Sequence, residues 1–116
     1  MEDITIWHNP RCSKSRNALN LLEEKNINAN VVKYLDDTPS KDELKEILNK
    51  LNMTVQELMR KGEAVYKELD LKSETNEEKL LDAMIENPKL IERPVIIRGE
   101  KAVVARPIEK LEELLK

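Results

Sequence analysis

A chain of 116 residues is long enough for one domain with a single modest core. Its 20 basic and 23 acidic side chains are interleaved, so the sequence indicates no broad basic surface for nucleic acid. No apolar run approaches the roughly 18 residues that cross a bilayer, and the N-terminus is acidic where a secretory signal is basic. We therefore expect one domain over residues 1–116 that acts in the cytoplasm, with no nucleic acid and no membrane as partner.

The first part of the chain predicts a βαβ unit. Residues 3–7 alternate between apolar and polar and run into a turn, which is typical of a strand. A helical pattern follows from about residue 13 to residue 25, and residues 30–35 are again extended. Strand, helix and strand within about 35 residues favour a parallel pair of strands.

Three helices are predicted next, each after a residue whose side chain can cap the helix. Their expected ranges are 41–51, 55–61 and 76–86, and Pro88 marks the end of the last. The capping boxes that begin them are Ser40 with Glu43, Thr54 with Glu57, and Thr75 with Glu78.

The C-terminal part predicts a hairpin and a final helix. Residues 94–98 and 101–105 are apolar runs separated by Gly99 and Glu100, with glycine at the first position of a two-residue turn. Pro107 can begin a helix with a buried leucine stripe. A βαβ half, a helical insertion and a ββα half predict an α/β protein with the thioredoxin-like fold, a four-stranded mixed sheet flanked by helices.

The chain has one cysteine, Cys12, and one histidine, His8. No internal disulfide can form, and the cysteine and histidine clusters that hold zinc are absent, so we expect no metal site. If Cys12 performs redox chemistry, the thiol that completes the cycle must therefore come from another molecule.

Cys12 lies between the first strand and the first helix. Free N–H groups and the helix dipole favour a thiolate at that position, and Arg11, Lys14 and Arg16 add positive charge, with His8 as a further candidate. A lone cysteine is often only a small buried hydrophobe. The polar, cationic turn around Cys12 favours a nucleophile instead.

Ser15 stands where a dithiol enzyme of the C-x-x-C type has its second cysteine. Its hydroxyl can donate to the Cys12 sulfur but cannot form a disulfide, which excludes ordinary dithiol oxidoreductase activity. A serine simply exposed in the first helical turn fits the sequence equally well.

The hairpin count places Arg93 opposite Arg106. Like charges that face each other across two strands are unfavourable unless an anion lies between them, and two guanidiniums can clamp a tetrahedral oxyanion. Two solvated arginines that splay apart are the alternative. Arg93 precedes Pro94, so the peptide bond between them, beside the thiol, can be cis.

Ten residues, from His8 to Asn17, resemble the H-N-P-x-C-x-x-S-R-N motif of the glutaredoxin-dependent arsenate reductases. The resemblance spans nearly the whole chain, because further landmarks of that family follow in order. They are Tyr34-Leu35, residues 57–60, residues 87–94 and Arg106-Pro107.

The resemblance implies a thioredoxin-like fold with a helical insertion and assigns roles to four residues. Cys12 attacks arsenate, and Arg60, Arg93 and Arg106 bind the oxyanion. Position alone would make Arg60 a partner of the helix dipole at the end of the third helix. Glutathione then attacks the arsenic and glutaredoxin reduces the adduct to release arsenite, with glutathione as external reductant and no bound cofactor. His8, Ser15 and Arg16 are the residues expected to stabilise the thiolate.

Two other functions stay open at this point. The same site could recognise another oxyanion or a glutathione adduct. A non-enzymatic redox regulator that binds RNA polymerase has this fold and chain length, although such proteins usually carry the C-x-x-C switch that Ser15 interrupts.

Overall fold

The computed structural model describes residues 3–106 and 108–116, and the chain forms two compact units. The first unit combines Met1–Asp37 with Arg93–Lys116, and the second unit is Thr38–Glu92. The expectation of a single domain over residues 1–116 stays a prediction. Within the described part of the chain, no helix has the length and apolar character needed to span a bilayer.

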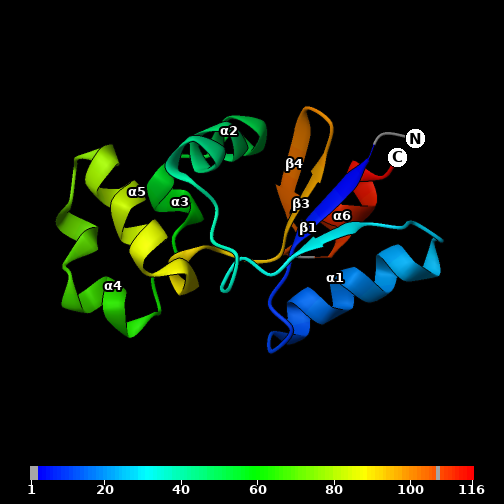
Figure 1. Cartoon of the computed structure of the whole chain (residues 1–116), viewed down its shortest axis with the longest axis horizontal. Helices are drawn as coiled ribbons and strands as arrows, with labels where there is room; N and C mark the ends of the chain where they lie inside the picture. The colour runs from blue at the N-terminus through cyan, green and yellow to red at the C-terminus, as the bar shows by residue number, and fades with distance from the viewer. Residues whose placement is uncertain (1–2, 107) are drawn as a thin grey trace. The chain divides into compact units, whose positions relative to one another are not determined.

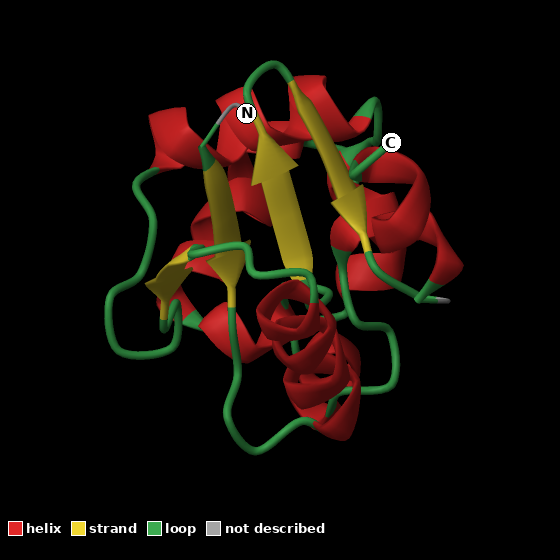
Figure 2. Cartoon of the chain, turned by 90° about the vertical axis from the view of Figure 1, so that its right-hand side faces the viewer, coloured by secondary structure: helices red, strands yellow, loops and turns green. Residues whose placement is uncertain are grey.

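The first unit contains the sheet. Its strands lie side by side in the order β2-β1-β3-β4 (Figure 2). Strand β1 pairs in parallel with β2 and antiparallel with β3, and β3 pairs antiparallel with β4, so the sheet is mixed as expected. The strands are β1 (Ile4–Trp7), β2 (Asn30–Val32), β3 (Val95–Arg98) and β4 (Lys101–Val104).

Strand β2 is shorter than expected. The chain turns after Val32, because the carbonyl of Lys33 accepts the backbone N–H groups of Asp36 and Asp37 at 3.0 and 2.9 Å. Residues 34 and 35 therefore belong to a turn.

The core of this unit lies between one face of the sheet and the helices α1 (Ser13–Glu24) and α6 (Glu109–Leu114) (Figure 1). Side chains alternate between the faces of a strand, so Ile4 and Ile6 share a face, and Ile6 pairs with Ile96 on β3. The helices contribute Ala18 and Leu22, one turn apart on α1, and Leu111 and Leu114 on α6.

The hairpin has the predicted register. Arg98 pairs with Lys101 across Gly99 and Glu100, and Gly99 has the positive φ of 56° that the first turn position needs. Ala105 N–H donates to the Pro94 carbonyl at 3.0 Å, which extends the pairing beyond the strand ends. The Arg93-Pro94 bond is cis. The predicted helix start at Pro107 lies outside the described residues.

The second unit is helical, and it is the insertion that the fold prediction expected. Its elements are α2 (Lys41–Leu51), α3 (Val55–Leu58), α4 (Ala64–Glu68), a 3-10 turn at Leu71–Ser73, α5 (Glu77–Glu86) and a 3-10 turn at Pro88–Leu90. The capping boxes of Ser40 with Glu43 and Thr54 with Glu57 are both present.

Two predictions about these helices were wrong. The cap of α5 is Asn76 rather than Thr75: its side chain accepts the N–H groups of Glu78 and Lys79 at 2.9 and 3.4 Å. Helix α3 ends at Leu58 rather than at residue 61, because Met59 leaves the helix to form an antiparallel bridge with Ile91. Helix α4 and the two 3-10 turns were not predicted.

Candidate active site

The loop between β1 and α1 is fixed by its own backbone. His8 N–H donates to the Val32 carbonyl at 2.8 Å, which continues the pairing of β1 with β2. The Asn9 carbonyl accepts the N–H of Cys12 at 3.0 Å, and its side-chain oxygen accepts the N–H of Arg11 at 3.0 Å. This tight turn delivers Cys12 to the start of the helix.

Cys12 occupies the N-cap position of α1. Its backbone is extended, with φ −94° and ψ 123°, and its carbonyl accepts the first helical hydrogen bond, from Arg16 N–H at 3.0 Å. The thiol is free and partly exposed. The sulfur therefore lies at the positive end of the helix dipole, within reach of the unpaired N–H groups of the first turn.

The surroundings favour the thiolate. Burial raises the pKa of the Cys12 thiol, but the backbone N–H groups of Ser15 and Lys14 and the side chain of Arg93 lower it, and the net pKa lies below the ordinary value. A larger share of Cys12 is therefore an anionic nucleophile near neutral pH than for an unperturbed thiol.

Arg93 and Arg106 meet at this sulfur. Arg106 Nη2 donates to Cys12 Sγ at 3.5 Å, and its Nε donates to the Arg93 carbonyl at 2.6 Å. Arg93 Nε is buried and has no hydrogen-bond partner within the described residues. The hairpin thus brings both arginine side chains to the thiol, as its register predicted.

Ser15 and His8 form a buried pair behind the loop. Ser15 is fully buried, and its hydroxyl oxygen lies 2.6 Å from His8 Nδ1 and accepts the N–H of Asn9 at 3.0 Å. The sequence allowed the hydroxyl to donate to the Cys12 sulfur. In the structure the hydroxyl contacts His8, and the backbone N–H of Ser15 acts on the sulfur. Its full burial rules out the alternative of an exposed serine.

His8 does not supply positive charge. Burial lowers its pKa below the ordinary value of 6.5, and the charges of Lys33 and Arg16 lower it further. The ring is therefore neutral near pH 7, and its expected contribution as a cation was wrong. His8 contacts the Ser15 hydroxyl, so it acts on the sulfur only indirectly, through Ser15.

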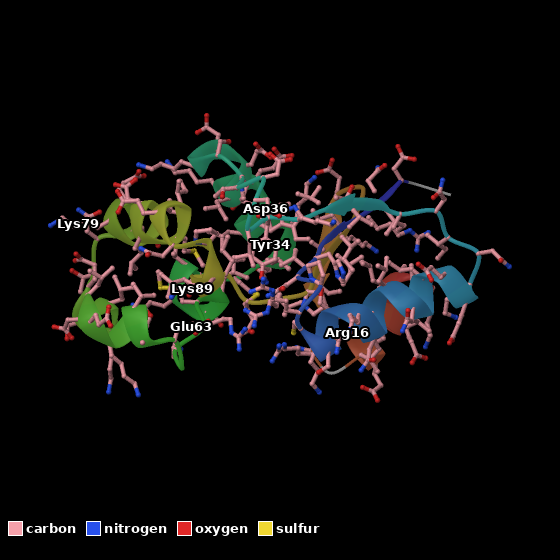
Figure 3. The ribbon with its side chains drawn as sticks, turned by 60° about the horizontal axis from the view of Figure 1, so that its bottom comes forward. Arg16, Tyr34, Asp36, Glu63, Lys79 and Lys89 are labelled. Atoms are coloured by element: carbon pink, nitrogen blue, oxygen red, sulfur yellow. The ribbon has the colours of Figure 1, made fainter. Side chains whose placement is uncertain are left out.

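Arg16 projects from the first turn of α1 (Figure 3). Its Nη1 donates to the carbonyl of Pro10 at 2.9 Å, so the side chain braces the loop that precedes Cys12. A direct role for Arg16 at the thiolate stays a prediction.

Arg60 belongs to the second unit. It lies two residues beyond the end of α3, so its interpretation as a helix-dipole partner was wrong. Its N–H donates to the Leu90 carbonyl at 2.7 Å, and its Nε lies 3.8 Å from Glu92 Oε1. Its expected role as an oxyanion ligand stays a prediction.

Two residues of this region escaped the sequence analysis. Asn9 organises the turn before Cys12, and its signal was the asparagine followed by proline, a common turn initiator. Glu92 pairs with Arg60, which no local pattern could reveal because the two lie 32 positions apart (92 minus 60). Among residues 3–106 and 108–116, no group of three or more metal-ligating side chains occurs.

The fold and the site define a class of protein. A helical insertion in a thioredoxin-like fold, with a single thiolate at the start of the first helix and two arginines beside it, is a thiol site suited to an anionic ligand. The model of the ArsC family matches residues 7–114. The chain belongs to the ArsC family.

Its similarity to individual relatives extends over the full chain. It is 49% identical to the arsenate reductase of Neisseria meningitidis serogroup B, over 99% of this chain and 100% of the relative. It is 45% identical to the uncharacterized protein YfgD of Escherichia coli K12, over 98% of both chains. The solved structure of an arsenate reductase from Vibrio cholerae has a TM-score of 0.93 and 44% identity, and the match covers 97% of both chains.

Proposed function

We propose that this protein is an arsenate reductase in which Cys12 is the nucleophile and an external thiol completes the reaction. The main support is that the side chains of Arg93 and Arg106 lie at the Cys12 sulfur. Arg106 Nη2 is 3.5 Å from Sγ, and Arg93 Nε is a buried N–H donor without a hydrogen-bond partner among the described residues. The names of the Neisseria and Vibrio relatives support arsenate as the oxyanion.

The two guanidiniums serve two purposes in this proposal. They bind the tetrahedral dianion through charge-assisted hydrogen bonds, and they neutralise charge that builds on its oxygens as sulfur attacks. Arg60 joins them as a third ligand, on the strength of the family resemblance. The reaction takes place in the cytoplasm, where thiols are kept reduced.

The proposed cycle balances with two external thiols. The Cys12 thiolate forms a bond to arsenic and one oxygen leaves as water. Glutathione then replaces a second oxygen. A glutaredoxin thiolate attacks the glutathione sulfur, so that a disulfide forms between them and the electron pair of the broken sulfur-arsenic bond reduces As(V) to As(III). Water finally releases arsenite and regenerates the Cys12 thiol.

The need for an external thiol follows from the single cysteine, and the family resemblance implies that glutathione and glutaredoxin supply it. With no second thiol in the chain, Cys12 cannot form the intramolecular disulfide that thioredoxin reduces. Ser15 occupies the position of a resolving cysteine, and it is buried and bonded to His8. No bound cofactor is required, because the two electrons come from the thiols of glutathione and glutaredoxin.

One coupled assay tests the proposal. With glutathione reductase present, NADPH consumption should require arsenate, glutathione and glutaredoxin together, and it should cease in Cys12→Ser. Ser15→Ala should be much milder, because it removes a hydrogen-bonding hydroxyl and not the nucleophile.

Two other results would redirect the assignment. Efficient turnover with thioredoxin and its reductase alone would contradict the external-thiol mechanism. If no thiol system supports turnover and the protein captures RNA polymerase, the results would favour the redox regulator over the enzyme.

A further inference from the structure

The Arg60 side chain is held close to a carboxylate without being fully bonded to it. Its Nε lies 3.8 Å from Glu92 Oε1, which is beyond hydrogen-bonding distance although within the range of an ion pair. Arg60 Nη1 is buried and has no hydrogen-bond partner in the part of the chain that the structure describes. The guanidinium therefore has a compensating charge nearby and at least one donor still unused.

The backbone fixes this pair. The backbone N–H of Arg60 donates to the Leu90 carbonyl at 2.7 Å, and the backbone N–H of Glu92 donates to the Leu58 carbonyl at 2.8 Å. These two hydrogen bonds flank the bridge between Met59 and Ile91. Residues 60 and 92 are thus diagonal neighbours on one face of a short antiparallel ladder.

The surroundings of the pair are only partly wet. The Arg60 side chain is 24% exposed and that of Glu92 is 26% exposed. A partly desolvated guanidinium needs an anion, and a donor without an acceptor in such a place is costly unless a ligand arrives.

We infer that Glu92 is the counter-ion of Arg60, and that an oxyanion competes with Glu92 for the Arg60 guanidinium. This inference rests on the proposed function, in which Arg60 is a ligand of the oxyanion. In this inference Glu92 is a positioning residue that acts through Arg60. Its carboxylate weakens binding of every anion, and a dianion competes with it better than a monoanion because its attraction to Arg60 is stronger.

The test compares how well inorganic phosphate protects Cys12 from iodoacetamide in wild type, Glu92→Gln and Arg60→Ala. Glu92→Gln keeps the shape and removes the charge, so the phosphate concentration for half protection should fall about two- to fivefold, the range of a partly exposed ion pair. In the assay of arsenate reduction, KM should fall by a similar factor while kcat does not rise.

Two controls separate this role from a general charge effect. Glu63→Gln removes a carboxylate three positions after Arg60 that has no ion pair within the described residues, and it should change protection less than Glu92→Gln. In the Arg60→Ala background, Glu92→Gln should have no effect, because the interaction it removes is already gone.

Three outcomes would overturn the inference. Weaker protection in Glu92→Gln would mean that the carboxylate orients Arg60 for binding and does not compete with the ligand. Equal effects of Glu92→Gln and Glu63→Gln would reduce it to long-range charge. Unchanged protection in Arg60→Ala would remove Arg60 from the site, while the roles of Arg93 and Arg106 would still be decided by their own variants.

Discussion

Arg106 Nη2 donates to Cys12 Sγ at 3.5 Å, across 94 positions of the sequence. The same guanidinium is anchored by its Nε on the Arg93 carbonyl at 2.6 Å. The hairpin therefore helps to orient the cation that lies beside the thiol.

The first prediction concerns the pKa of Cys12. Iodoacetamide reactivity should titrate with a midpoint below the ordinary thiol value of about 8.5, because burial raises the pKa less than the backbone N–H groups of Ser15 and Lys14 and the Arg93 side chain together lower it. Arg93→Ala should move that midpoint upward. Lys14→Ala is the matched control, since it removes an exposed cation and keeps the backbone N–H, and it should move the midpoint less.

The second prediction concerns oxyanion binding by the hairpin arginines. Arsenate or phosphate should slow alkylation of Cys12, and Arg93→Ala or Arg106→Ala should weaken this protection about tenfold or more, the value of one charge-assisted hydrogen bond. Lysine at either position should rescue poorly because an ammonium lacks the planar fork of donors. Full protection in both alanine variants, with an unchanged circular dichroism spectrum, would show that the arginines are only surface charges.

The third prediction concerns the pH dependence of stability. The pKa of His8 is lowered in the folded state, so below about pH 6.5 the unfolded chain binds a proton that the folded chain does not. The His8 contribution is present above that pH and is lost as the pH falls toward the lowered value. Urea midpoints at pH 7 and pH 5 should differ more for wild type than for His8→Gln. An equal difference in both proteins would mean that carboxylates alone cause the acid sensitivity.

The fourth prediction tests the corrected cap of α5. Asn76→Ala should lower the free energy of unfolding by about 1 kcal/mol, because two backbone N–H groups lose their acceptor. Thr75→Ala should change it by a few tenths at most. Denaturant titration of the two variants gives the comparison, and a larger loss from Thr75→Ala would restore the residue that the sequence pattern favoured.

Local sequence patterns predicted the structure correctly where a feature depends only on neighbouring residues. The alternation of Ile4 and Ile6, the capping boxes at Ser40 and Thr54, and the Gly99 turn all depend on neighbours within a few residues, and the structure confirms them. The hairpin register was predictable for the same reason: a two-residue turn leaves only one pairing, and that pairing already places Arg93 opposite Arg106.

Helix ends and charge states were decided by the tertiary structure. Helix α3 stops at Leu58 because Met59 pairs with Ile91, which is 32 positions away (91 minus 59). His8 is neutral because folding buries it.

For the Cys12 thiol too, the sequence determined some properties and the tertiary structure determined others. The sequence alone determined that Cys12 begins a helix and has no second cysteine to pair with. The sequence around Cys12 predicted that its own cationic neighbours activate it, and this stays a prediction. The structure adds the side chains of Arg93 and Arg106, which act on the sulfur from the hairpin. Electrostatic interaction depends on distance in space, and only the folded structure brings Arg106 Nη2 to 3.5 Å from Cys12 Sγ, a residue 94 positions earlier in the sequence.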